Sequence, residues 1–304
     1  MVNGGLPNAV HLPHPTKSQT HTMKIVIQHP ELITDSTAQA LFKPFAGAPV
    51  RVNEKAYAIH NTLFTPAQKR ALIAAAQPLS IDVACLERDV TWVDFKVLAM
   101  DMDSTLINIE CIDEIADLAG KKTEVASITE ASMRGEIKDF NESLIRRMAF
   151  FAGTPFALLD DVLRERLRIN DGAHALIRAA QAHGVRCVLV SGGFTYFAEQ
   201  VQKELNLDAI HANTLEIVDG RITGKVIGEI VNGDVKARLV REHCEQLHVD
   251  ALSAIAMGDG SNDVPMMSIS GLSVAYRAKP MVQERAMMTL NFVGLDGLAV
   301  VLGT

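Results

Sequence analysis

The stretch Val97-Leu98-Ala99-Met100-Asp101-Met102-Asp103-Ser104-Thr105 decides the fold of this chain. Four apolar residues end abruptly in an acidic pair, which is typical of a short strand buried on both faces of a parallel sheet. The same pattern returns where Cys187–Val190 precedes Ser191 and where Ile255–Met257 precedes Gly258. Because the carboxyl ends of such strands share one edge of the sheet, we expect the polar residues that follow them to form one site.

Helical patterns separate these strands, as in Phe197, Val201 and Leu205 at four-residue spacing. Alternating strands and helices predict an α/β domain with a doubly wound, Rossmann-like parallel sheet, over residues 91–304. Residues 112–168 instead carry consecutive helical patterns without a strand signal. We therefore expect an inserted helical cap there.

Two further features of this domain have their own signals. One helix of the cap is expected to begin at Thr154-Pro155, because proline is favoured in the first helical turn. Residues 214–231 predict a β-hairpin that turns at Asp219-Gly220.

Residues 23–90 predict a small α+β domain without a catalytic grouping, and a regulatory role for it is open. Its expected elements are strands at Met23–Ile27, Val50–Ile59 and Ile81–Leu86, a helix at Asp35–Phe42, and a helix that a capping box starts at Thr65–Gln68. Residues 1–22 predict a flexible leader, and Met23 is an alternative translation start.

Composition and charge exclude several classes of protein. The chain has 304 residues, with 29 Lys+Arg, 36 Asp+Glu and a net charge of −7, which argues against nucleic acid as the main partner. No apolar run approaches the ~18–20 residues of a membrane helix, and no secretory signal pattern precedes Met23. The four cysteines are scattered without a CxxC motif, which predicts reduced thiols in a cytoplasmic protein.

Two acidic motifs carry the chemistry. Asp101 and Asp103 follow a buried strand, and Gly258–Asp263 (GDGSND) follows another, with Asp259 and Asp263 in it. Four carboxylates crowded at one sheet edge raise one another's pKa or bind a cation. A site of oxygen ligands suits Mg²⁺, which keeps water ligands and recruits a substrate phosphate.

The third and fourth motifs suit an anion. Ser191-Gly192-Gly193-Phe194 is expected between a strand and a helix, where a hydroxyl and free amides form an anion cradle. Lys236, ahead of the apolar helical face of Leu239 and Val240, could supply a fixed positive charge to the same anion. Taken singly, each motif is a common turn or a solvated charge.

The order of the four motifs resembles the haloacid dehalogenase superfamily of phosphatases and, within it, the phosphoserine phosphatases, over about residues 96–280. The matching positions are Asp101–Thr105, Glu110, Met133–Gly135, Phe140, Ser143, Leu144, Arg147, Ser191–Phe194, Lys236 and Gly258–Asp263. One departure is that four residues stand between Gly135 and Phe140, where the family usually has three.

The resemblance implies Mg²⁺-dependent hydrolysis of O-phospho-L-serine, the last step of serine biosynthesis. Asp101 would attack phosphorus and form an aspartyl-phosphate, while Asp103 would protonate the leaving oxygen and later activate water. One Mg²⁺ would be held by Asp101, Asp259 and the backbone carbonyl of Asp103, with Asp263 orienting metal-bound waters.

The resemblance also assigns substrate contacts. Ser191, the Gly192 amide and Lys236 would stabilise the phosphoryl oxygens. In the cap region, Glu110 would bind the substrate ammonium and Arg147 its carboxylate. The remaining expected substrate contacts are Phe140, covering the site against water, and Asn262.

Alternative functions stay open at this point. The chain could transfer the phosphoryl group to another alcohol such as homoserine, or act on another small phosphomonoester. A third alternative is a non-catalytic amino-acid-sensing protein on an inert phosphatase fold. In every case we expect a small-molecule ligand without nucleic acid or membrane partners, and a homodimer is open.

Overall fold

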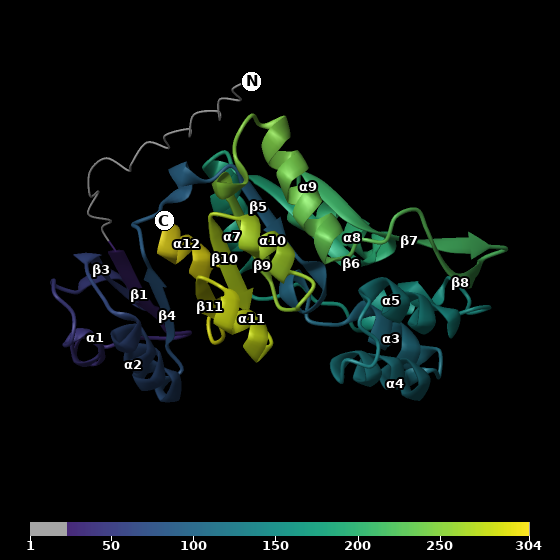
Figure 1. The fold of residues 1–304 in the computed structure, drawn as a ribbon, viewed down its shortest axis with the longest axis horizontal. Helices are drawn as coiled ribbons and strands as arrows, with labels where there is room; N and C mark the ends of the chain where they lie inside the picture. The colour runs from purple at the N-terminus through teal and green to yellow at the C-terminus, as the bar shows by residue number, and fades with distance from the viewer. Residues whose placement is uncertain (1–22, 304) are drawn as a thin grey trace, which may run out of the picture.

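The computed structural model describes residues 23–303, and the predicted leader lies outside them. These residues form two sheets: a four-stranded sheet of order β2-β3-β1-β4 and a seven-stranded sheet of order β11-β10-β9-β5-β6-β7-β8. Figure 1 shows the small sheet and a group of helices, the cap, at opposite ends of the large sheet. No helix among residues 23–303 combines the length and apolarity needed to cross a membrane.

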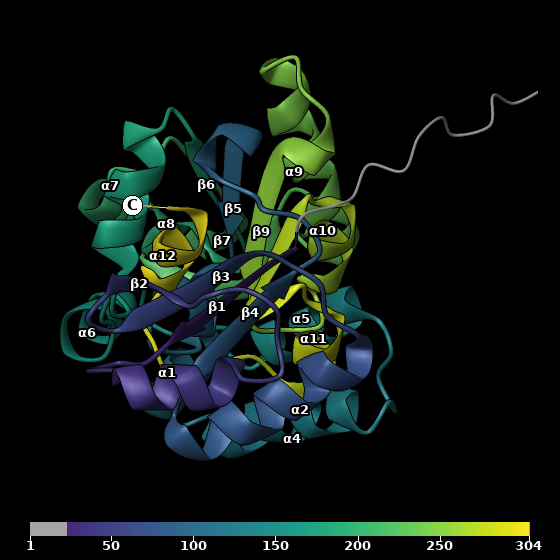
Figure 2. The ribbon, with the colours of Figure 1, turned by 90° about the vertical axis from the view of Figure 1, so that its left-hand side faces the viewer.

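The small sheet is antiparallel and packs on both faces. Its elements are β1 (Met23–Gln28), α1 (Asp35–Phe42), β2 (Val50–Asn53), β3 (Ala56–Thr62), α2 (Pro66–Ala76) and β4 (Asp82–Leu86). Side chains alternate along β1, so that Ile25 and Ile27 pack with residues of α1 and α2, whereas Val26 joins the core of the large domain. Figure 2 shows both helices beside this sheet.

The local sequence signals predict the helices and strands of this domain correctly except at one turn. The capping box of α2 is present, since Thr65 accepts from the amide of Gln68 at 3.2 Å and Gln68 accepts from the amide of Thr65 at 2.9 Å. The single strand expected over 50–59 is wrong. The chain turns at Glu54-Lys55 and forms the hairpin β2–β3, in which Asn53 accepts from the amide of Lys55 at 2.8 Å.

The large sheet is parallel through its centre and covered on both faces, which confirms the doubly wound α/β fold. Its strands are β5 (Val97–Met100), β6 (Arg186–Phe194), β7 (Ala209–Val218), β8 (Arg221–Ile227), β9 (Ala254–Gly258), β10 (Leu272–Tyr276) and β11 (Met288–Leu290). The core on one face includes Leu98 and Met100, and the core on the other includes Val97 and Ala99. The strand is therefore apolar throughout because both faces are buried.

Helices cover these two faces. Those whose buried residues join Leu98 are α7 (Ala173–Ala182), α8 (Thr195–Leu205) and α12 (Gly297–Leu302). Those whose buried residues join Val97 are α9 (Gly233–Gln246), α10 (Val264–Ile269) and α11 (Pro280–Arg285). The parallel strands thus end together at an edge between two helical layers.

The cap lies beyond that edge. It consists of α3 (Cys111–Leu118), α4 (Lys122–Met133), α5 (Phe140–Ala149) and α6 (Leu158–Glu165). The helix expected from Thr154-Pro155 begins later, at Leu158, because Pro155 pairs with Arg221 of the β7–β8 hairpin. That hairpin turns at Asp219-Gly220 as expected, and it contacts the cap along α5.

Candidate active site

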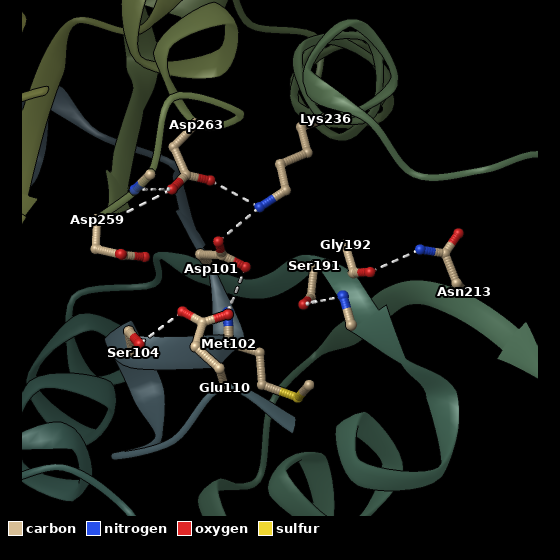
Figure 3. A network of polar contacts seen from close by, with 12 residues as sticks. Asp101, Met102, Ser104, Glu110, Ser191, Gly192, Asn213, Lys236, Asp259 and Asp263 are labelled. Atoms are coloured by element: carbon tan, nitrogen blue, oxygen red, sulfur yellow. Dashed lines mark hydrogen bonds and ion pairs between the residues drawn. The ribbon is translucent and has the colours of Figure 1, made fainter. Parts of the chain in front are cut away.

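The motif residues of the large sheet meet at the carboxyl ends of β5, β6 and β9, facing the cap. Asp101 follows β5, Ser191–Gly193 lie near the end of β6, and Asp259 follows β9. They line a cavity of about 540 Å³ whose other wall belongs to the cap. Figure 3 shows how these side chains converge.

Lys236 lies behind the cavity between two carboxylates. Its Nζ is 2.8 Å from Oδ2 of Asp101 and 2.7 Å from Oδ1 of Asp263, and its side chain is fully buried (Figure 3). Burial opposes the charge of the lysine, but the two carboxylates outweigh it and raise the pKa of Lys236. The ammonium is therefore a fixed positive charge beside Asp101.

The acidic cluster fits a divalent cation. Asp101, Asp259 and Asp263 each place a carboxylate oxygen within 4.8 Å of the others. Burial, followed by the charges of Asp101 and Asp263, raises the pKa of Asp259 to about 8. A carboxyl pKa this high shows that burial and the neighbouring carboxylates disfavour the ionised form of Asp259. A divalent cation that prefers oxygen ligands would stabilise the ionised form.

Asp263 is already engaged by the protein. Its Oδ1 pairs with Lys236, and its Oδ2 accepts from the amides of Asp259 at 3.1 Å and Gly260 at 3.0 Å. Few of its lone pairs are left for a metal. This fits its expected place behind Asp101 and Asp259 rather than as a direct ligand.

Asp103 lies in a local turn at the cavity, where the residue is half-buried. Met102–Leu106 form a short π-helical segment, and Ser104 has a φ of 55°, which bends the chain after Asp103. The Oδ1 of Asp103 is buried without a hydrogen-bond partner. Burial first, and then the charge of Glu110, raises the pKa of Asp103 well above its ordinary value. Burial is thus a larger cause of this pKa shift than the crowding of carboxylates expected from the sequence.

The Ser191–Phe194 segment differs from the expected strand-to-helix turn. Strand β6 continues through it, and Phe194 pairs with Asn213 of β7 before α8 begins at Thr195. A Cβ at Gly193 would lie 2.7 Å from Cε of Met102 and 2.8 Å from Oδ2 of Asp103, so a larger residue there would displace these side chains. The amide of Gly193 donates to Oγ of buried Ser191 at 2.8 Å.

The cap and the chain leading to it supply the opposite wall. Glu110, Phe140 and Arg147 line the cavity together with Asn262 of the acidic loop. Oγ of Ser104 donates to Glu110 at 2.7 Å and holds that carboxylate at the cavity. One anionic and one cationic side chain therefore face the same space, as an amino-acid group requires.

The structure brings all the motif residues together and adds others that motif reasoning missed. Asn213 is buried and joins two segments, since its Nδ2 donates to the carbonyl of Gly192 at 2.8 Å and its Oδ1 accepts from the amide of Val231 at 2.9 Å. An asparagine inside a strand is unusual enough to have signalled a polar contact. Lys279 lines the cavity as a further cation, for which the sequence offers no distinct signal.

Comparisons with known proteins agree with this geometry. The family of haloacid dehalogenase-like hydrolases matches residues 98–268. A phosphoserine phosphatase of Polaromonas sp. is 52% identical over 69% of this chain and 91% of its own length. A solved probable phosphoserine phosphatase of Vibrio cholerae, unliganded, is 33% identical with a TM-score of 0.78, over 94% of this chain and 88% of its own. A phospho-aspartyl intermediate analogue of phosphoserine phosphatase is 32% identical with a TM-score of 0.64, over 69% of this chain and 99% of its own.

Proposed function

This chain belongs to the haloacid dehalogenase-like hydrolases and among them to the phosphoserine phosphatase family, and we propose that it hydrolyses O-phospho-L-serine to serine and inorganic phosphate. The observation that carries the proposal is a division of labour between two carboxyls in one cavity. Asp101 is paired with buried Lys236, whereas burial raises the pKa of Asp103 well above its ordinary value. One can therefore act as the nucleophile and the other as the general acid.

In the first step, an oxygen of Asp101 forms a bond to phosphorus and the bond from phosphorus to the seryl oxygen breaks. Asp103 transfers its proton to that oxygen, so serine leaves as a neutral alcohol. In the second step, Asp103 takes a proton from water, whose oxygen attacks phosphorus and releases Asp101. Splitting the reaction in this way lowers a barrier that makes uncatalysed monoester hydrolysis extremely slow.

Charge at the phosphoryl group is stabilised by fixed groups of the chain. Ser191, the Gly192 amide and the ammonium of Lys236, which is paired with Asp101, would stabilise the phosphoryl oxygens. Asp101, Asp259 and the carbonyl of Asp103 would hold one Mg²⁺, with Asp263 behind them. When bound, the cation offsets the repulsion between carboxylate and phosphate.

The amino-acid part of the substrate is proposed to contact the cap. Glu110 would accept from the ammonium group and Arg147 would bind the carboxylate, while Phe140 and Asn262 enclose the ester. Burial lowers the pKa of Arg147, but the guanidinium keeps its charge because its ordinary pKa lies far above neutrality. A transferase that passes phosphate to homoserine would need the same first step, so the acceptor distinguishes the two.

We place this reaction at the end of serine biosynthesis in the cytoplasm. The four cysteines are buried and free, as expected in a reducing compartment. The homodimer left open by the sequence stays a prediction, which light scattering tests.

The decisive experiment measures phosphate release from phosphoserine with and without Mg²⁺, beside Asp101→Asn. We expect release that requires the metal and that Asp101→Asn abolishes. Formation of homoserine phosphate from phosphoserine and added homoserine, in place of inorganic phosphate, would instead indicate the transferase. An absence of metal-dependent release from every phosphomonoester offered would reject both enzymatic proposals.

The proposed role of Arg147 has a separate test. Replacing Arg147 by Ala removes the partner of the substrate carboxylate, so kcat/KM for phosphoserine is expected to fall by at least ~100-fold. Hydrolysis of p-nitrophenyl phosphate, which has no such carboxylate, should change far less. Arg146→Ala is the matched control, because Arg146 points to exposed Glu142 on the same helix. Equal losses for both substrates would contradict the role.

A further inference from the structure

A hydrogen bond between two asparagines joins the cap to the core beside the active site. Nδ2 of Asn232, at the start of α9, donates to Oδ1 of Asn141 in the first turn of α5 at 3.0 Å, and the contact is partly buried. The two residues are 91 positions apart. Neither side chain lines the cavity.

The core side of this bond is held in a fixed orientation. Asn232 is the N-cap of α9, and its Oδ1 accepts from the amide of Val235 at 3.0 Å. Because that oxygen is used by the helix, the amino group must point to the cap. The carbonyl of Asn232 accepts from the amide of Lys236 at 2.9 Å, so the lysine lies one turn along from the contact.

The cap side belongs to the segment that closes the cavity. Asn141 follows Phe140, whose Cζ lies 2.9 Å from the position of a Cβ at Gly192. The Phe140 ring therefore lies against Gly192 of β6, and a movement of α5 would carry this ring away from the strand. Gly233, next to Asn232, packs in turn on the carbonyl of Asn262, 3.0 Å from its would-be Cβ.

We propose that Asn141 and Asn232 form a latch that holds the cap closed over the substrate while Lys236 is in place at Asp101. The inference rests on the proposed function and deepens it. Both asparagines are positioning residues, acting through Phe140 on one side and through the helix of Lys236 on the other. When α5 moves away, Asn232 loses its partner but keeps the helix cap, so α9 stays folded through each turnover.

The size of the effect follows from the chemistry of the bond. A neutral hydrogen bond contributes about 0.5–1.5 kcal/mol, which corresponds to a ~2- to 10-fold shift of the equilibrium between closed and open cap. We therefore expect a loss of this size in kcat/KM for phosphoserine, without loss of the chemical machinery.

Four variants separate the latch from a structural role. Asn141→Ala removes the acceptor, whereas Asn141→Asp retains it and is expected to behave like the wild type. Asn232→Asp keeps the helix cap, since its oxygen still accepts from Val235, but removes the donor. The double variant Asn141→Ala/Asn232→Asp should lose no more than the worse single variant, because both remove the same bond.

The measurements are steady-state kinetics on phosphoserine and hydrogen exchange of residues 140–149 with Mg²⁺ and inorganic phosphate bound. Faster exchange and lower kcat/KM in Asn141→Ala and Asn232→Asp, but not in Asn141→Asp, would support the latch. Wild-type exchange and kinetics in both loss variants would overturn it. Wild-type protein inactive on phosphoserine would reject the proposed function, and the exchange of the four variants would then decide the latch alone.

Discussion

At the scale of single residues, burial gives identical side chains different chemistry. Asp101 and Asp103 stand two positions apart in the sequence, and the chain bends at Ser104 so that Asp103 is separated from Lys236, which Asp101 faces. Burial also raises the pKa of Asp259 to about 8. These shifts have consequences for stability as well as for reactivity.

The sign of the Asp259 contribution to stability follows from its pKa values. In the unfolded chain this carboxyl ionises near its ordinary value of 3.8, whereas in the metal-free folded protein it keeps its proton up to about pH 8. A raised carboxyl pKa stabilises the folded state at low pH, and that contribution is lost as the pH rises from about 4 to about 8.

Mg²⁺ should therefore stabilise the protein most at high pH. Its binding requires ionised carboxylates, so the increase in melting temperature on adding Mg²⁺ is expected to be larger at pH 8 than at pH 6. At 100 times its dissociation constant, the metal would add about 2.7 kcal/mol. Thermal melts with and without Mg²⁺ measure this, and Asp259→Asn should lose most of the increase. An increase independent of pH would contradict a metal at Asp259.

At the scale of secondary-structure elements, the β7–β8 hairpin joins the large sheet to the cap: β7 pairs with β6, and β8 contacts α5. β7 pairs with β6 near Ala209–His211 and then continues into the hairpin, which packs on α5. Gly224 of β8 has a φ of +85° and lies against this helix, with a would-be Cβ only 3.1 Å from the carbonyl of Met148. The hairpin is therefore the fixed side of the cap, opposite the asparagine latch.

Two glycines of the hairpin allow this contact to be measured. Gly224 and Gly228 share a positive φ, but nothing lies within 4 Å of a Cβ at Gly228. Substitution by Ala strains the backbone by about 1–2 kcal/mol at either position, and at Gly224 the crowding adds about 1–3 kcal/mol. Urea unfolding should thus show Gly224→Ala as clearly the less stable variant. Equal losses would mean that α5 yields to the added methyl group.

At the scale of the whole molecule, one carboxylate anchors the N-terminal domain to the phosphatase domain. Asp82 of β4 is buried and accepts from three successive amides after β11, those of Asn291 at 2.8 Å and of Phe292 and Val293 at 2.9 Å. Burial raises the pKa of Asp82, and the three amides only partly offset this. A charge held by three donors at a domain boundary resists separation of the domains.

We expect Asp82→Ala to lower the free energy of unfolding by about 3 kcal/mol, because one buried and two partly buried amides lose their acceptor. Trp92, the one tryptophan of the chain, reports on this boundary: it is buried and stacked on His183 at 5.4 Å between ring centroids. The control is Arg51→Ala, which removes an exposed ion pair with Asp35 within the N-terminal domain and should cost less than about 1 kcal/mol. Matching losses in fluorescence-monitored unfolding would show that Asp82 is not an anchor.

Local patterns of the sequence predicted the parallel sheet, the helical cap and the four motifs at the sheet edge. They did so because alternation, apolar runs and capping residues act within a few positions of the chain. Three boundaries differ from the prediction: the turn at Glu54-Lys55, the start of α6 at Leu158, and the extension of β6 through Phe194. Each of them depends on pairing with another strand, which local patterns do not encode.

Tertiary structure alone decided the chemical state of the site. The raised pKa of Asp103 depends on burial, and the charge of Lys236 depends on the carboxylates that follow β5 and β9. Asn213 and the pair of Asn141 and Asn232 act through partners far along the chain. Burial and contact are properties of the folded chain. Residue spacing could therefore identify these carboxyls as site residues, but it could not predict how their pKa values shift.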